Sequence, residues 1–273
     1  MPIHTSVPIK AIDQSVFHEI DEKVTGLAYD IHNEFGRYLD ESLYQCELAR
    51  RCRAIGYDVI HEPELRMTAS LDDFVKDYFA DLLINQSVIV ETKAVATLVP
   101  AHTGQILNYL LLCGLHHGSL LNFRTERVQH EFVSTRLTPA DRVRYELDSS
   151  EWSPLSRECE LLKDHFVRCV KEWGAFPDPL LYRDALTHFL GGPASVVRNV
   201  PVYSQGEMIG SQEMRLITDD IAFAVTAATH HPDSLLEHQR RFLSHTKLKA
   251  IQWINLHHHK ITFRTITHRG KTE

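Results

Sequence analysis

The sequence predicts a mixed α/β fold, and three patterns in its first half carry this prediction. Apolar residues recur at three- and four-residue spacing in two early segments, which is the period of an amphipathic helix. Three β-rich apolar segments follow, and then a further helical segment leads into two short strands. This order of elements predicts helices packed against a mixed sheet.

The helical segments are bounded in the sequence by glycine. They cover residues 16–35, 39–55 and 101–113. Each ends immediately before a glycine, namely Gly36, Gly56 and Gly114. Glycine is a common helix stop because it adopts the left-handed backbone conformation without steric cost. We therefore expect three helices with well-defined ends.

The strand segments lie between and after these helices. They cover residues 57–67, 74–84, 88–94, 118–123 and 127–134. A turn-like Asn85-Gln86-Ser87 separates the second from the third. The residues on both sides of this turn are continuously apolar, which is typical of strands that are buried on both faces.

Composition excludes several classes of protein. With 273 residues, 43% of them hydrophobic and 24% charged, the chain resembles ordinary globular proteins rather than disordered or fibrous ones. It lacks both an apolar run of about 20 residues and a signal-like N-terminus, so we expect a cytoplasmic protein with no membrane partner. Its five cysteines form no C-x-x-C pair, which argues against a disulfide framework or a zinc site. The net charge of −7 argues against nonspecific coating of nucleic acid.

Three charged residues fall within the predicted buried strands. Glu91 and Lys93 are two positions apart and share one strand face, and a neighbouring strand can bring Asp81 beside them. Two converging carboxylates repel each other unless a cation lies between them, and their oxygens suit Mg²⁺ or Mn²⁺. An exposed polar strand face is the alternative, but the apolar flanks favour burial, and buried charges require a partner or a metal.

Two helical pairs extend this set. Gln105 and Tyr109 are four residues apart on the third predicted helix, and Glu41 and Tyr44 are three apart on the second. A polar surface residue next to a core tyrosine would explain each pair taken alone. The ordered combination with the charged strand residues favours a common site.

In this order the residues resemble a known family. The segments that carry the resemblance are Gly36 with Glu41-x-x-Tyr44, Asp81, and the stretch IVETKAVATLVPAHTGQILNYL. They resemble the GxxExxY family of the PD-(D/E)xK nuclease superfamily, and the Gln-x-x-x-Tyr helix is similar to that of RecB-type exonucleases. The resemblance spans about residues 21–133. It implies a restriction-endonuclease-like mixed β-sheet flanked by helices.

The resemblance also implies a metal site. Asp81 and Glu91 would be ligands of Mg²⁺ or Mn²⁺, together with the backbone carbonyl of Thr92. Glu41 would be a further ligand through a water. The sequence departs from the family pattern at Arg37-Tyr38, where Pro-Gly is usual, and at Thr92, where leucine is usual.

The activity implied is metal-dependent hydrolysis of phosphodiester bonds, with DNA favoured over RNA. Lys93 would place the attacking hydroxide and stabilise the pentacovalent phosphate, while Gln105 and Tyr109 would shape the pocket. The catalytic set implied is Glu41, Asp81, Glu91, Lys93, Gln105 and Tyr109. The alternative is a catalytically silent module that retains the nuclease fold and binds nucleic acid or protein.

The second half of the chain repeats features of the first. A run of similar residues recurs at an offset of 138, as from Glu34 to Glu172. Farther along the chain the offset is 133, as from Tyr109 to Phe242. One net deletion accounts for both offsets, although chance similarity between two α/β segments is the alternative. We therefore predict an internal pseudo-dimer that can act as a monomer.

The repeat predicts a degenerate second domain. The two domains would cover residues 15–138 and 155–273, joined by the polar stretch 138–154. The predicted counterparts are Pro179 for Glu41, Ala224 for Glu91, Thr226 for Lys93, His238 for Gln105, and a position on or near Arg215 for Asp81. A copy without carboxylates cannot hold the metal ion, but it can still pack against the first copy or contact a phosphate backbone through arginines.

Overall fold

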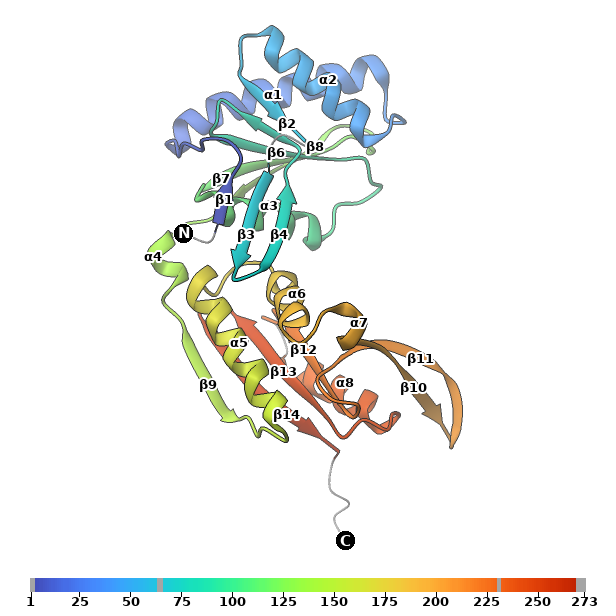
Figure 1. Ribbon diagram of the computed structural model, residues 1–273. Helices are drawn as coiled ribbons and strands as arrows, with labels where there is room; N and C mark the ends of the chain where they lie inside the picture. Colours follow the sequence, from blue (N-terminus) through green and yellow to red (C-terminus); the bar gives the residue numbers. More distant parts are fainter. Residues whose placement is uncertain (1–2, 63–65, 230–231, 269–273) are drawn as a thin grey trace. The chain divides into compact units, whose positions relative to one another are not determined.

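The computed structural model divides the chain into two compact units (Figure 1). The structure describes residues 3–62, 66–229 and 232–268. Unit 1 comprises Met1–Ser70 with Val75–Pro139, and unit 2 comprises Leu71–Phe74 with Ala140–Glu273. Each unit contains helices and a mixed sheet, which confirms the predicted α/β fold class.

Unit 1 is built on a five-stranded sheet in the order β2-β5-β6-β7-β8. Its strands are β2 (Val59–His61), β5 (Leu82–Ile84), β6 (Val88–Lys93), β7 (His117–Asn122) and β8 (Gln129–Ser134). β6 and β7 run parallel, and the other neighbouring pairs are antiparallel. A parallel pair needs a crossover connection, which helix α3 (Pro100–Cys113) supplies between β6 and β7.

Helices bury both faces of this sheet. The first face packs against α1 (Gln14–Phe35) and α2 (Glu41–Ala54), and the second packs against α3. Alternate residues of β6 divide between the two cores, since Val90 belongs to the first and Ile89 to the second. The apolar stretches around the turn are therefore buried on both faces, as their sequence predicts.

Two of the predicted strands are each divided in the structure. The segments predicted as residues 57–67 and 74–84 contribute β2 and β5 to the five-stranded sheet. They also contribute to β3 (Arg66–Leu71) and β4 (Phe74–Phe79), which join β1 (Ile3–Thr5) in a separate three-stranded sheet. The second division falls at Ala80-Asp81, where aspartate is a poor strand former and its main-chain N–H bonds a side chain instead of a neighbouring strand.

Unit 2 contains a six-stranded sheet in the order β10-β11-β12-β13-β14-β9. Its strands are β9 (Glu146–Glu151), β10 (Val197–Ser204), β11 (Glu207–Leu216), β12 (Ile221–Thr226), β13 (Ala250–His257) and β14 (Lys260–Thr267). The helices of this half are α4 (Pro139–Arg142), α5 (Arg157–Trp173), α6 (Pro179–Phe189), α7 (Pro193–Val196) and α8 (Pro232–Ser244). The pairs β12–β13 and β14–β9 are parallel, and the others are antiparallel.

The stretch predicted as a linker, residues 138–154, instead contributes α4 and β9. β9 is an edge strand that pairs with β14, and two ion pairs join them: Asp148 with Lys260 at 3.2 Å and Glu151 with Arg264 at 3.0 Å. A polar composition can therefore indicate either a linker or an edge strand that is held by cross-strand ion pairs, and here it belongs to an edge strand. None of the described helices is both long and apolar enough to cross a membrane.

The phenol of Tyr44 fastens the connection between α1 and α2. Its hydroxyl donates to the Gly36 carbonyl at 2.7 Å and accepts from the Leu39 N–H at 3.2 Å, and its ring stacks on Phe123. Tyr44→Phe keeps the ring but leaves these backbone groups unpaired. We expect it to lower the free energy of unfolding by about 1–2 kcal/mol in urea titrations. Exposed Tyr38→Phe is the control, and equal stability of the two variants would contradict this role.

Candidate active site

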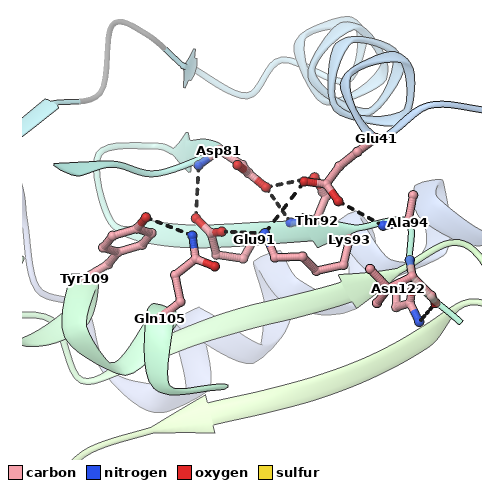
Figure 2. Close-up of polar contacts among 10 residues, drawn as sticks. Glu41, Asp81, Glu91, Thr92, Lys93, Ala94, Gln105, Tyr109 and Asn122 are labelled. Atoms are coloured by element: carbon pink, nitrogen blue, oxygen red, sulfur yellow. Dashed lines mark hydrogen bonds and ion pairs between the residues drawn. The ribbon is translucent and has the colours of Figure 1, made fainter. Parts of the chain in front are cut away.

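The charged residues singled out in the sequence meet at one end of β5 and β6 (Figure 2). Asp81 directly precedes β5, while Glu91 and Lys93 lie at the end of β6. Glu41 comes from the first turn of α2. Residues from three separate parts of the sequence therefore share one polar cluster, as their strand and helix positions predict.

The hairpin between β5 and β6 places Asp81 opposite Glu91. Asn85 and Gln86 form its turn with positive φ values of 50° and 58°, the backbone conformation that a tight hairpin requires. The resulting register pairs Leu82 with Val90. One step farther along the pair, the Asp81 N–H donates to Glu91 Oε1 at 3.1 Å.

Thr92 holds the carboxylate of Asp81 through two hydrogen bonds. Its main-chain N–H donates to Asp81 Oδ2 at 2.7 Å, and its hydroxyl donates to the same oxygen at 2.9 Å. Both residues are buried. Strand alternation predicts that the Thr92 side chain points away from Glu91 and Lys93, and the resemblance assigns only its carbonyl a role. The hydroxyl reaches Asp81 because that residue lies just before the first residue of β5, outside the regular pleat.

Lys93 lies between two carboxylates. Its Nζ atom is 3.3 Å from Glu91 Oε2 and 3.7 Å from Glu41 Oε1. The other oxygen of Glu41 accepts from the Ala94 N–H at 3.0 Å. Burial by itself lowers the pKa of the Lys93 ammonium, but Glu91, Asp81 and Glu41 together raise the pKa above its ordinary value. Lys93 is therefore a charged lysine at neutral pH.

Glu91 is a fully buried acid beside another acid. Burial, followed by the repulsion of Asp81, raises the pKa of Glu91 to about 8, although Lys93 acts in the opposite direction. The pKa of Tyr109 is also raised, first by burial and then by Glu91. With three carboxyl groups and one lysine, the cluster carries an excess of negative charge when Glu91 is ionised, and a divalent cation can neutralise that excess.

Gln105 and Tyr109 lie on α3, beside the same cluster (Figure 2). Gln105 Nε2 donates to the Tyr109 hydroxyl at 2.9 Å, so the predicted helical pair is in direct contact. Tyr109 is buried and Gln105 is half-buried. The amide therefore orients the phenol, which is close enough to Glu91 for that acid to raise the pKa of Tyr109.

Asn122 is a structural residue of the site that the sequence does not single out. Its Oδ1 accepts from the Val95 N–H at 3.1 Å, and its Nδ2 donates to the Val95 carbonyl at 2.8 Å. This clamp fixes the chain where it leaves β6, just after Lys93. A buried asparagine at the end of an apolar strand is the only sequence signal for it.

The acidic groups suit a metal with few protein ligands. No group of three or more histidine, cysteine, aspartate or glutamate side chains is arranged to hold a metal ion in the described ranges. Asp81 and Glu91 supply two neighbouring carboxylates, while Glu41 bonds Lys93 and Ala94. Mg²⁺ is commonly held by one or two carboxylates with water completing its shell, so this donor set fits such an ion.

Comparison with known proteins finds a family match in the first part of the chain. Residues 18–135 match the family model described as the PD-(D/E)XK nuclease superfamily. Comparisons with curated proteins and with solved structures gave no significant match. The matched segment contains the whole polar cluster, and its mixed sheet is consistent with a restriction-endonuclease-like fold. Residues 18–135 therefore match the PD-(D/E)XK nuclease superfamily, the superfamily that the sequence motifs resemble.

Proposed function

We propose that unit 1 is a metal-dependent nuclease that hydrolyses phosphodiester bonds, with DNA as the favoured substrate. The observation that carries this proposal is the convergence of Asp81, Glu91 and Lys93 at one buried position. A purely structural ion pair does not need a second acid there, because that acid raises the pKa of Glu91 and destabilises its charged form. A carboxyl group whose charged form is destabilised in this way is typical of functional sites.

Asp81 and Glu91 would hold Mg²⁺ or Mn²⁺, together with the main-chain carbonyl of Thr92 and water. A bound divalent ion supplies an activated water and offsets charge on the phosphate oxygens. The raised pKa of Glu91 supports this assignment, because a cation would replace the missing positive charge. Glu41 contributes through its contact with Lys93, and a water-mediated contact with the ion belongs to the same proposal.

Lys93 would act directly on the reacting groups. Its ammonium lies on the Glu91 side of the cluster, where it can orient the attacking water and stabilise negative charge on the phosphate. The contact with Glu41, at 3.7 Å, would limit the freedom of this ammonium. Gln105 and Tyr109 would form the wall that positions the scissile phosphate.

Membership of the GxxExxY family is part of the same proposal. The two marker residues of its name have distinct tasks in this chain, since Glu41 bonds Lys93 while Tyr44 fastens the loop that precedes α2. The Gln105–Tyr109 contact supports the likeness to RecB-type helices. A cytoplasmic location stays a prediction from the sequence.

A cleavage assay on four substrates tests the proposed function. The full chain is incubated with single- and double-stranded forms of DNA and RNA, in Mn²⁺ or in EDTA. We expect Mn²⁺-dependent cleavage of DNA that Asp81→Ala and Lys93→Ala both remove. Binding of DNA without cleavage, equal in the wild type and both variants, would instead support a silent nucleic-acid-binding module.

Thr92 is expected to act as a positioning residue for Asp81. Thr92→Val keeps the shape of the side chain and the main-chain bond but removes the hydroxyl bond to Asp81 Oδ2. We expect about a tenfold loss of Mn²⁺ affinity in calorimetric titrations, the usual effect of losing a partner of a metal ligand. Thr92→Ser restores the hydroxyl and should restore affinity. Equal affinities for the valine and serine variants would exclude this role.

A further inference from the structure

We infer that unit 2 is a copy of the nuclease fold in which a hydrophobic cluster around Trp253 fills the place of the acidic pocket. The chain would then carry a single catalytic site, in unit 1. This inference goes beyond the proposed function and rests on the internal geometry of each unit. Three kinds of observation support it: strand topology, two local hydrogen-bond motifs, and the side chains at equivalent register positions.

The two main sheets share their strand plan. In unit 1 the order β5-β6-β7-β8 runs antiparallel, parallel and antiparallel. In unit 2 the order β11-β12-β13-β14 runs in the same way. Helices α1 and α2 precede the first set, while α5 and α6, followed by the four-residue α7, precede the second. A single helix, α3 or α8, crosses over between the parallel strands. Strand β9 is an addition at the edge of the second sheet.

A tyrosine–glycine contact between α1 and α2 recurs between α5 and α6. Tyr44 donates to the carbonyl of Gly36, and Tyr182 donates to the carbonyl of Gly174. The two glycines have nearly the same backbone angles, with φ 73° and ψ −159° at Gly36 and φ 87° and ψ −168° at Gly174. The two tyrosines are 138 residues apart, and so are the two glycines. The repeat therefore extends to a specific hydrogen bond.

An asparagine clamp recurs at the other offset, 133. Asn122 bonds both the N–H and the carbonyl of Val95, and Asn255 bonds both groups of Ala228 in the same way. Each clamp holds the chain where it leaves the first of the two parallel strands. A buried side chain that makes the same pair of backbone bonds in both units is not explained by a shared hydrophobic pattern.

Strand register gives the counterpart of each acidic residue. Leu82 pairs with Val90 in unit 1, and Arg215 pairs with Phe223 in unit 2. Because Val90 and Phe223 are 133 residues apart, Arg215 takes the place of Leu82. Asp81 then corresponds to the preceding residue, Met214. The sequence comparison placed this counterpart on or near Arg215, and the register moves it by one residue.

The counterparts of the pocket residues belong to one hydrophobic cluster. Met214, Ala224, Phe242 and Trp253 replace Asp81, Glu91, Tyr109 and Leu120, respectively, and all four pack in the same core of unit 2. Glu91 is paired in register with Leu120, whereas Ala224 is paired with Trp253. In unit 2 the small residue Ala224 stands in place of the acid, and the large residue Trp253 stands in place of Leu120. The Trp253 ring therefore occupies the space that the acid would fill.

The polar groups of Thr226, Trp253 and Asn255 bond to one another. Thr226 stands at the position of Lys93, where its hydroxyl accepts from Trp253 Nε1 at 2.8 Å and donates to Asn255 Oδ1 at 2.7 Å. This chain of bonds links the indole to the asparagine clamp. An apolar, hydrogen-bonded cluster offers no carboxylate to a divalent ion, so metal-supported hydrolysis is not expected in unit 2.

A double-mutant cycle on the full chain tests the filled pocket. All three tryptophans of the chain, Trp152, Trp173 and Trp253, lie in unit 2, so their fluorescence reports its unfolding in urea. Trp253→Leu opens a cavity beside Ala224 and should lower the unfolding midpoint. Ala224→Leu refills that space, so the double variant should recover part of the lost midpoint.

A cycle that combines Trp253→Leu with Glu207→Ala, at the first residue of β11, serves as the control, and its effects on the midpoint should be additive. If the changes in unfolding midpoint caused by Trp253→Leu and Ala224→Leu simply add in the double variant, the packing assignment is overturned. A crystal structure of the full chain in which residues 155–268 fail to superpose on residues 15–138 would overturn the fold assignment.

Mn²⁺ titrations of the full chain test whether unit 1 holds the single metal site. We expect the double variant Asp81→Asn with Glu91→Gln to lose all Mn²⁺ binding, and Thr226→Ala to bind as the wild type does. Binding that survives the first change and is lost with Thr226→Ala would overturn the inference. If the wild-type protein binds no Mn²⁺, the proposed function fails, whereas the double-mutant cycle still decides whether unit 2 has a filled pocket.

Discussion

Replacing Lys93 with alanine is expected to slow phosphodiester cleavage by at least about 10²-fold, the usual effect of removing a charge-stabilising donor from an active site. The ammonium lies 3.3 Å from Glu91 and 3.7 Å from Glu41. Its loss removes the positive charge that would stabilise the phosphate in the transition state. The rate is measured at saturating Mn²⁺, so that weaker metal binding does not account for the change.

Two controls make this result specific. Lys93→Arg keeps the charge but not the compact geometry of an ammonium, so we expect only partial recovery of the rate. Lys171→Ala removes an exposed lysine of α5 and should leave the rate unchanged. Cleavage by Lys93→Ala at the wild-type rate, with the wild-type circular dichroism spectrum, would contradict a catalytic role for this lysine.

Glu91→Gln is expected to abolish cleavage and yet stabilise the metal-free protein at alkaline pH. The pKa of Glu91 rises from 4.5 to about 8 in the folded chain. The folded state therefore holds a proton that the unfolded state has released, and stability falls as the pH increases from about 4.5 to 8. Glutamine carries no such proton. In EDTA at pH 9 we expect a gain on the order of 1–3 kcal/mol in unfolding free energy, which disappears toward pH 4.

Glu47→Gln is the matched control because its pKa shift has the opposite sign. Arg50 and Arg51 lower the pKa of Glu47 to about 2 through hydrogen bonds on α2. This acid stabilises the protein above its unfolded pKa, so its replacement should cost at most about 1 kcal/mol at pH 9. A Glu91→Gln protein less stable than the wild type at pH 9 in EDTA would show that Glu91 is not a strained acid.

Much of the site could be predicted from the sequence because strand and helix periods determine which residues share a face. The two-residue spacing of Glu91 and Lys93 indicates a common face, and the apolar flanks indicate burial. The short turn at Asn85 limits how far Asp81 can lie from Glu91. The structure brings these residues together through the hairpin register that such a turn imposes.

Other features depend on tertiary contacts that no periodicity encodes. The hydroxyl of Thr92 reaches Asp81 because β5 begins only at Leu82 and leaves Asp81 outside the strand, a detail set by the local chain path. Strand β9 has the composition of a linker and becomes a strand because β14 offers it an edge. In the proposed repeat, the sequence places the counterpart of Asp81 only on or near Arg215, and strand register is needed to assign it to Met214.

Cleavage of DNA by the wild-type protein and by Asp81→Asn, measured side by side with Mn²⁺ and with EDTA, tests the central claim most directly. The substitution removes one negative charge and preserves the size of the side chain. The account predicts that the wild type cleaves only with Mn²⁺ and that Asp81→Asn does not cleave above background in either condition. Equal cleavage by the two proteins, or wild-type cleavage that persists in EDTA, would contradict it.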